Sequence, residues 1–118
     1  MNQLGLWGEQ QACQYFIQKA YCFVEKNYYC KQGEIDLIFL KNKIHYFIEV
    51  KTRLVKTGSR PFMEDVFPVA KQRRFWKAVC HYLSVKEISD AYQMGLVVVW
   101  GKEKKWTLSY YDNVELLI

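Results

Sequence analysis

Residues 35–51 read IDLIFLKNKIHYFIEVK, two apolar runs of β-favouring residues separated by Lys41-Asn42-Lys43. A polar break that contains asparagine, placed between two such runs, is typical of a β-hairpin. Large apolar side chains fall on both faces of each run, so we expect a sheet that is covered on both sides. This hairpin is therefore predicted to form the centre of the fold.

The segments around the hairpin alternate between helical and strand patterns. Apolar residues recur at helical spacing over residues 7–20 and again from about 68 to 84. We expect short strands at 22–25, 94–100 and 106–111, a polar connection at 28–32 and a basic loop at 52–61. The order helix, strands, helix, strands predicts an α/β fold: one domain over residues 1–118, with a central mixed β-sheet flanked by α-helices.

Composition narrows the class of protein further. The chain has 118 residues, 51% of them hydrophobic, which suits one compact domain. A net charge of +5 suits a polyanionic partner such as nucleic acid. The four scattered cysteines lack zinc-ligand spacing, so we expect reduced and mostly buried thiols. Without a signal peptide or an apolar run of about 20 residues, the prediction is a cytoplasmic protein with no membrane partner.

Two acidic residues, Asp36 and Glu49, interrupt strands that otherwise look buried. If Asn42-Lys43 is the two-residue turn, paired positions sum to 85, and this register sets Asp36 opposite Glu49. Their Cβ atoms would then lie about 5 Å apart on one face of the sheet. Lys51 follows Glu49 by two residues and therefore points to the same face.

Two bare carboxylates at about 5 Å repel each other by roughly 3 kcal/mol at an effective dielectric constant of 20. Either Lys51 or a divalent cation can offset this repulsion. Mg²⁺ takes oxygen ligands and keeps several waters, so two carboxylates and a substrate phosphate suit it. The alternative is a structural cluster in which Asp36, Glu49 and Lys51 form ion pairs that hold the sheet together.

Glu9 is a candidate third acid because it precedes Cys13 by four residues and Phe16 by seven, on the apolar side of the first helix. A carboxylate there needs a partner, which a metal site on the sheet would supply. The alternative is a surface glutamate in the first turn, favoured by the helix dipole.

Basic residues form a second set of candidates, for binding a phosphate backbone. Lys71 stands near the start of the second helix, four residues before Phe75, and either reaches the same cleft or extends into solvent. Others lie on that helix or in the basic loop, and a solvated face is the alternative for them. This set comprises Arg53, Lys56, Arg60, Arg73, Arg74 and Lys77.

Four motifs together resemble the UPF0102 (YraN-like) family of bacterial proteins. They are Gly8-Glu9, GEIDLI at 33–38, FIEVKTR at 47–53 and KQRR at 71–74. That family is similar to the PD-(D/E)XK nuclease superfamily and especially to archaeal Holliday-junction resolvases. The resemblance covers residues 6–83 and implies a restriction-endonuclease-like fold.

The same resemblance implies roles for individual residues. Asp36 and Glu49 match the acidic metal ligands, Lys51 the motif lysine, and Glu9 the helix glutamate that supplements the site in resolvase-like members. It also implies Mg²⁺ or Mn²⁺ as cofactor and a possible homodimer. Two stretches depart from the family pattern: Asn42-Lys43 at the hairpin tip, and residues 93–96, where a supporting carboxylate would be expected.

Three functions remain open from the sequence. The first is a divalent-metal-dependent endonuclease acting on DNA, including branched or structured DNA. The second is a nucleic-acid-binding module of nuclease fold with little or no catalytic activity. The third is a structural or protein-interaction domain in which the acids form ion pairs.

Overall fold

The computed structural model describes residues 2–54 and 63–117. Its elements run α1 (Gln3–Gln18), β1 (Cys22–Cys30), β2 (Gly33–Lys41), β3 (Ile44–Arg53), α2 (Met63–Val66), α3 (Val69–Val85), β4 (Tyr92–Lys102) and β5 (Lys105–Tyr111). The five strands form one sheet in the order β1-β2-β3-β4-β5. Only β3 and β4 pair in parallel, and the other neighbours are antiparallel. The sheet is therefore mixed, as the sequence predicts.

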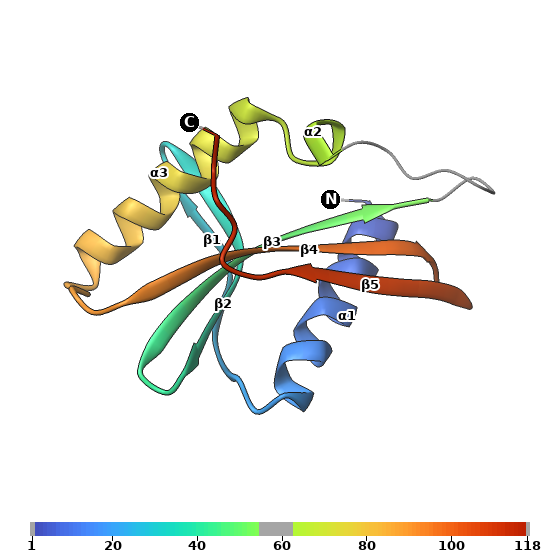
Figure 1. The fold of residues 1–118 in the computed structure, drawn as a ribbon, viewed down its shortest axis with the longest axis horizontal. Helices are drawn as coiled ribbons and strands as arrows, with labels where there is room; N and C mark the ends of the chain where they lie inside the picture. The colour runs from blue at the N-terminus through green and yellow to red at the C-terminus, as the bar shows by residue number, and fades with distance from the viewer. Residues whose placement is uncertain (1, 55–62, 118) are drawn as a thin grey trace.

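Helices cover both faces of this sheet, α1 on one side and α3 on the other (Figure 1). Phe16 of α1 packs with Leu37, Phe39 and Ile48 on the first face. On the second face, α3 contributes the buried residues Phe75, Ala78, Val79 and Tyr82. This arrangement confirms the predicted α/β class and is compatible with a restriction-endonuclease-like fold.

The hairpin register is also confirmed. Paired Cα atoms run from Lys41 opposite Ile44 to Leu37 opposite Ile48, and every pair sums to 85. Asn42 and Lys43 both have positive φ angles, 53° and 67°, as a type I′ turn requires. The turn type therefore fixes the register that brings Asp36 toward Glu49.

Several predicted boundaries were wrong. The first helix starts at Gln3 rather than Trp7, because the Asn2 side chain accepts a hydrogen bond from the Gly5 N–H and caps it. Residues 28–30 continue β1 instead of forming a connection, and the chain turns at Lys31-Gln32. The short helix α2 was not predicted, and Ile17, an apolar residue of the first predicted helix, is 52% exposed.

Cysteine burial differs from expectation as well. Cys22 and Cys80 are exposed, while Cys13 and Cys30 are half-buried, so the prediction of mostly buried thiols was wrong. All four are free. In the part of the chain that the structure describes, no helix is long and apolar enough to cross a membrane.

Candidate metal and phosphate site

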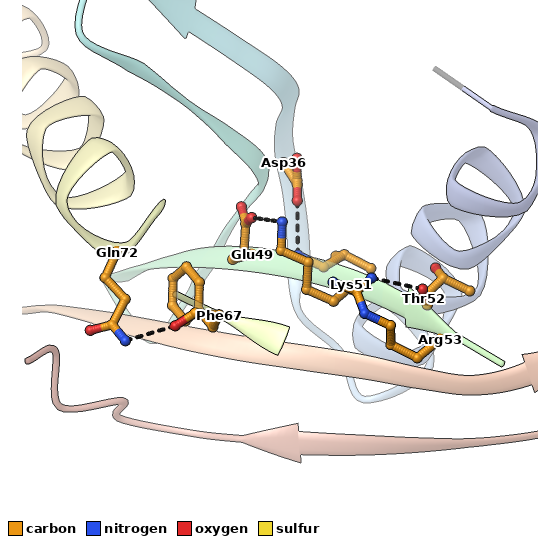
Figure 2. Close-up of polar contacts among 8 residues, drawn as sticks. Asp36, Glu49, Lys51, Thr52, Arg53, Phe67 and Gln72 are labelled. Carbon is orange, nitrogen blue, oxygen red and sulfur yellow. Dashed lines mark hydrogen bonds and ion pairs between the residues drawn. The ribbon is translucent and has the colours of Figure 1, made fainter. Parts of the chain in front are cut away.

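Asp36 lies where β2 leaves its regular pairing. Within the described sheet, Leu37 is paired with a residue of β1 and with a residue of β3. Asp36, the residue before it, is paired with neither strand. Instead, the Asp36 carboxylate accepts a hydrogen bond of 2.8 Å from the Val50 backbone N–H (Figure 2). The side chain thus satisfies a backbone donor that a regular ladder would have used, and it is held against β3.

Glu49 and Lys51 project from β3 toward α3. Phe47, Glu49 and Lys51 are alternate residues of β3, so their side chains point to the same face, and Phe47 packs in the core beneath α3. Lys51 Nζ lies 2.8 Å from Glu49 Oε2, and Glu49 is only 8% exposed (Figure 2). The predicted grouping of Asp36, Glu49 and Lys51 is therefore present, with the lysine paired to one acid.

One lysine does not neutralise two neighbouring carboxylates. Burial and then repulsion from Glu49 raise the pKa of Asp36 from 3.8 to about 8, although the Val50 hydrogen bond and Lys51 lower it. A structural ion-pair cluster with balanced charges would instead keep this pKa low. Near neutral pH Asp36 therefore holds a proton, in the position where a cation would otherwise offset the repulsion from Glu49.

Glu9 lies close enough to this group to feel its charge. Its pKa is raised to about 7, first by burial and then by Asp36 and Glu34, whereas Lys26 and Lys51 lower it. The half-buried side chain stands on α1 beside Gly8, and this helix packs onto β3 at Thr52. An added Cβ at Gly8 would meet Thr52 Oγ1 at 1.8 Å, so glycine permits the close approach that carries Glu9 toward the sheet.

The Glu9 carboxyl should make stability fall as pH rises. Its folded pKa of about 7 exceeds the unfolded value of 4.5, so the folded state holds the proton more tightly. This contribution to stability is complete below pH 4.5 and is lost as the pH rises through 7. We expect Glu9→Gln to flatten the fall in Tm between about pH 5 and 7, and a carboxyl NMR titration of the wild type to place the Glu9 midpoint near 7.

Glu115→Gln is the matched control because Glu115 is exposed. It should leave the pH dependence of Tm unchanged. An unshifted Glu9 midpoint would mean that the helix glutamate is solvated, as the helix-dipole alternative holds.

A pocket of about 280 Å³ adjoins Glu49 on the α3 side, and Asp36 does not line it. Glu49 and Lys51 line it from β3, Lys71 and Arg74 from α3, and the β1–β2 turn closes it. The pKa of Lys71 is lowered, first by the positive charge of Lys51 and then by burial. Lys71 therefore lines the pocket beside Lys51, although the residue as a whole is exposed.

The other basic candidates are placed less centrally. Arg53 follows Lys51 on β3, where its guanidinium donates a hydrogen bond of 2.9 Å to the Thr52 carbonyl. Arg73 lies on the exposed face of α3 and does not line the pocket. Lys56 and Arg60 lie outside the described residues.

Some residues of the site were missed from the sequence. Glu34 and Gly33 line the pocket, and a Cβ at Gly33 would meet the Arg74 carbonyl oxygen at 2.2 Å. Gln72 was not missed, since its place beside Lys71 makes it a weaker candidate from the sequence, but it does not line the pocket. It is buried, its amide N–H donates to the Phe67 carbonyl and its amide oxygen accepts from the Leu117 N–H. The role of Gly33 at the pocket follows from the contact between the β1–β2 turn and α3. Nothing in the local sequence predicts that contact.

The two acids are the oxygen donors that the site offers to a metal ion. Among residues 2–54 and 63–117, no three His, Cys, Asp or Glu side chains gather closely enough to hold an ion. Asp36 and Glu49 are a pair of hard oxygen donors, which fits Mg²⁺ or Mn²⁺ completed by water and phosphate better than a closed protein cage.

Fold and site together define a small α/β protein with an acidic pair beside a cationic pocket. Comparison with known sequences gives its family: residues 8–100 match the model of "Uncharacterised protein family UPF0102". The chain is 35% identical to a UPF0102 protein of Clostridium perfringens strain 13 over 91 residues, which are 77% of this chain and 73% of that protein.

Two further relatives agree with this match. A UPF0102 protein of Alkaliphilus metalliredigens is 35% identical over 115 residues, covering 95% of this chain and 96% of the relative. Another, from Syntrophomonas wolfei, is 47% identical over 82 residues, 70% of each chain. The chain therefore belongs to the UPF0102 family, as the sequence motifs indicate.

Proposed function

We propose that this protein is a divalent-metal-dependent endonuclease that hydrolyses phosphodiester bonds of DNA, including branched or structured DNA. The β2–β3 register supports the proposal, because it brings Asp36, held by the Val50 N–H, near Glu49 and directs Lys51 to the edge of a cationic pocket. Asp36 and Glu49 repel each other, and so do Lys51 and Lys71. A metal ion between the acids and a phosphate between the lysines would offset both repulsions. Such an enzyme would act in the cytoplasm, where DNA is present.

Asp36 and Glu49 would hold Mg²⁺ or Mn²⁺, with Glu9 supplementing them from α1. The ion supplies Lewis acidity, which activates water and stabilises negative charge on the phosphate. Lys51, released from Glu49 in part, would orient the water or bind a phosphate oxygen. Lys71 and Arg74 would bind the phosphate backbone on the α3 side, with Arg53 and Arg73 farther out.

Cleavage assays test this proposal directly. Plasmid, single-stranded and four-way-junction DNA would each be incubated with Mg²⁺, Mn²⁺ or EDTA. We expect cleavage with either ion and none with EDTA, and loss of cleavage in Asp36→Ala and Glu49→Ala. Activity that survives either substitution would rule out the assignment.

The pocket cations should contribute to DNA affinity without selecting a sequence. Lys71→Ala and Arg74→Ala each remove a phosphate contact, so each should reduce the slope of log K against log salt for duplex binding by about 1. Lys43→Gln is the control, because Lys43 is exposed at the turn on the opposite end of β3. Equal slopes in all variants would show that the pocket does not contact the backbone.

A binding module without catalysis is the second candidate. It is favoured by the contacts that already engage both acids, Asp36 with the Val50 N–H and Glu49 with Lys51. DNA binding that is unchanged by metal and by Asp36→Asn, in a protein that does not cleave DNA, would support this candidate.

Light scattering of the same samples, free and with junction DNA, would test the proposed homodimer.

A further inference from the structure

A second basic feature lies at the start of α1 and the tip of the β4–β5 hairpin. It is a hollow of about 590 Å³, lined by Trp7 on α1 and by residues 102–105 at the hairpin tip. Trp106, the next residue along β5, contacts Trp7 edge to face with ring centroids 5.5 Å apart and planes at 86°. We name these two rings and the tip the tryptophan hollow.

Core packing does not account for Trp106. The ring is 38% exposed, and it lies outside both buried clusters of the sheet. Its contact with Trp7 fixes the ring orientation, while more than a third of its surface stays open to solvent. A rigid, partly exposed indole is a common platform for a flat aromatic ligand.

The charge around the rings is positive. Lys102, Lys104 and Lys105 line the hollow, against the single acid Glu103. All four residues are exposed, and none of the lysines forms an ion pair within the part of the chain that the structure describes. Three lysines beside an indole pair match a ligand that carries both phosphates and flat bases.

The tryptophan hollow and the carboxylate site are neighbours along the strands but lie on different faces, because Trp7 packs on the α1 side and Glu49 and Lys51 point to the α3 side. Trp7 is two residues before Glu9 on α1, and Gly8 between them packs on Thr52 of β3. Arg53 pairs with Trp100 across the parallel β3–β4 ladder, and Lys102 lies two residues farther along β4. At about 3.3 Å per residue, Lys51 and Lys102 are about 13 Å apart along the strands, the length of about four stacked nucleotides.

We propose that the tryptophan hollow binds an unpaired segment of single-stranded nucleic acid. This inference rests on the proposed function in taking nucleic acid as the partner. A base would stack on Trp106 while the lysines contact its flanking phosphates. Duplex DNA keeps its base faces inside the stack, so the indole favours unpaired strands.

The first test measures binding of a fluorescein-labelled poly-dT oligonucleotide by anisotropy, with EDTA present to prevent cleavage. Trp106→Ala should weaken binding by about 5- to 150-fold, the usual loss when one base–aromatic stack is removed. Affinity for a blunt duplex should change less than 3-fold. Tyr111→Ala is the matched control, because Tyr111 is also on β5 and is also 38% exposed, and its single-strand affinity should equal that of the wild type.

A second variant removes charge without touching the aromatic rings. Lys104→Gln combined with Lys105→Gln should reduce the single-strand salt slope by about 1.4, since each phosphate contact contributes about 0.7. This result does not depend on whether Trp106→Ala folds. Near-UV circular dichroism would check the folding of each variant.

Three results would overturn the inference: unchanged single-strand affinity in folded Trp106→Ala, an unchanged salt slope in the lysine variant, or equal losses for duplex and single strand. The outcome is separable from that of the proposed nuclease. If the protein cleaves DNA with metal but both variants bind single strands as the wild type does, the proposed role of the hollow is rejected and the nuclease proposal stands. Impaired single-strand binding in a protein that cuts no DNA supports the hollow and rejects the nuclease.

Discussion

Asp36→Asn is expected to make the metal-free protein more stable near pH 7.5 and to abolish metal-dependent cleavage. The folded pKa of Asp36 is about 8 and the unfolded value is 3.8, so stability falls as pH rises between these values. Asparagine cannot ionise. Its carbonyl can still accept from the Val50 N–H, and its amide can donate to Glu49 in place of the protonated acid.

The gain should be of order 2 kcal/mol, because partial solvent access reduces the full linkage penalty. A domain of this size gains about 4 °C in Tm for each kcal/mol, so we expect a rise of roughly 8 °C at pH 7.5 and little change near pH 4. Cleavage should fall by about 100- to 1,000-fold or more.

Differential scanning calorimetry across this pH range, paired with the cleavage assay, measures both effects. Asp90→Asn is the control, since Asp90 is exposed and lies in the loop before β4. A lower Tm for Asp36→Asn at pH 7.5 would mean that the ionised acid stabilises the fold, as the structural ion-pair alternative requires.

Gly33→Ala is expected to give the largest loss of stability. Its Cβ would meet the Arg74 carbonyl oxygen at 2.2 Å and the carbonyl carbon at 2.8 Å, and these are backbone atoms inside α3 that cannot rotate away. Either the β1–β2 turn or the helix must shift. Overpacking of this kind costs about 1–3 kcal/mol, so Tm should fall by roughly 4–12 °C.

The same shift would displace Lys71 and Arg74 from the pocket, so duplex affinity should fall in the variant even where it remains folded. Gln32→Ala, an exposed neighbour in the same turn, serves as control for the melting experiment. Wild-type Tm in Gly33→Ala would show that the turn and α3 do not touch in solution.

The centre of the fold was predictable because its signals are local. A two-residue turn with strong β runs on each side determines the register as far as Leu37 and Ile48, which brings Asp36 near Glu49 and Lys51. The apolar stripe of α3 was equally clear, since Phe75, Ala78, Val79 and Tyr82 are all buried.

Elsewhere, tertiary contacts overrode local patterns. Tyr28 looked like part of a connection, but its ring packs on Tyr82 and its hydroxyl lies 2.6 Å from His81 Nδ1, which keeps the chain extended in β1. The sequence placed Glu9 and Lys71 on the helix faces that approach the acids. It could not show the break in pairing at Asp36, because that break depends on a hydrogen bond to Val50, fourteen residues away.

The Asn42-Lys43 turn makes the acidic pair sensitive to chain length at a distant point. Asp36 lies six residues from Asn42, about 20 Å along an extended strand. Inserting or deleting a single residue in the turn would rotate every later side chain of β3 to the other face, moving Glu49 and Lys51 into the core beneath α1. Length changes that preserve the acidic pair must therefore come two residues at a time, or together with a compensating bulge in one of the two strands.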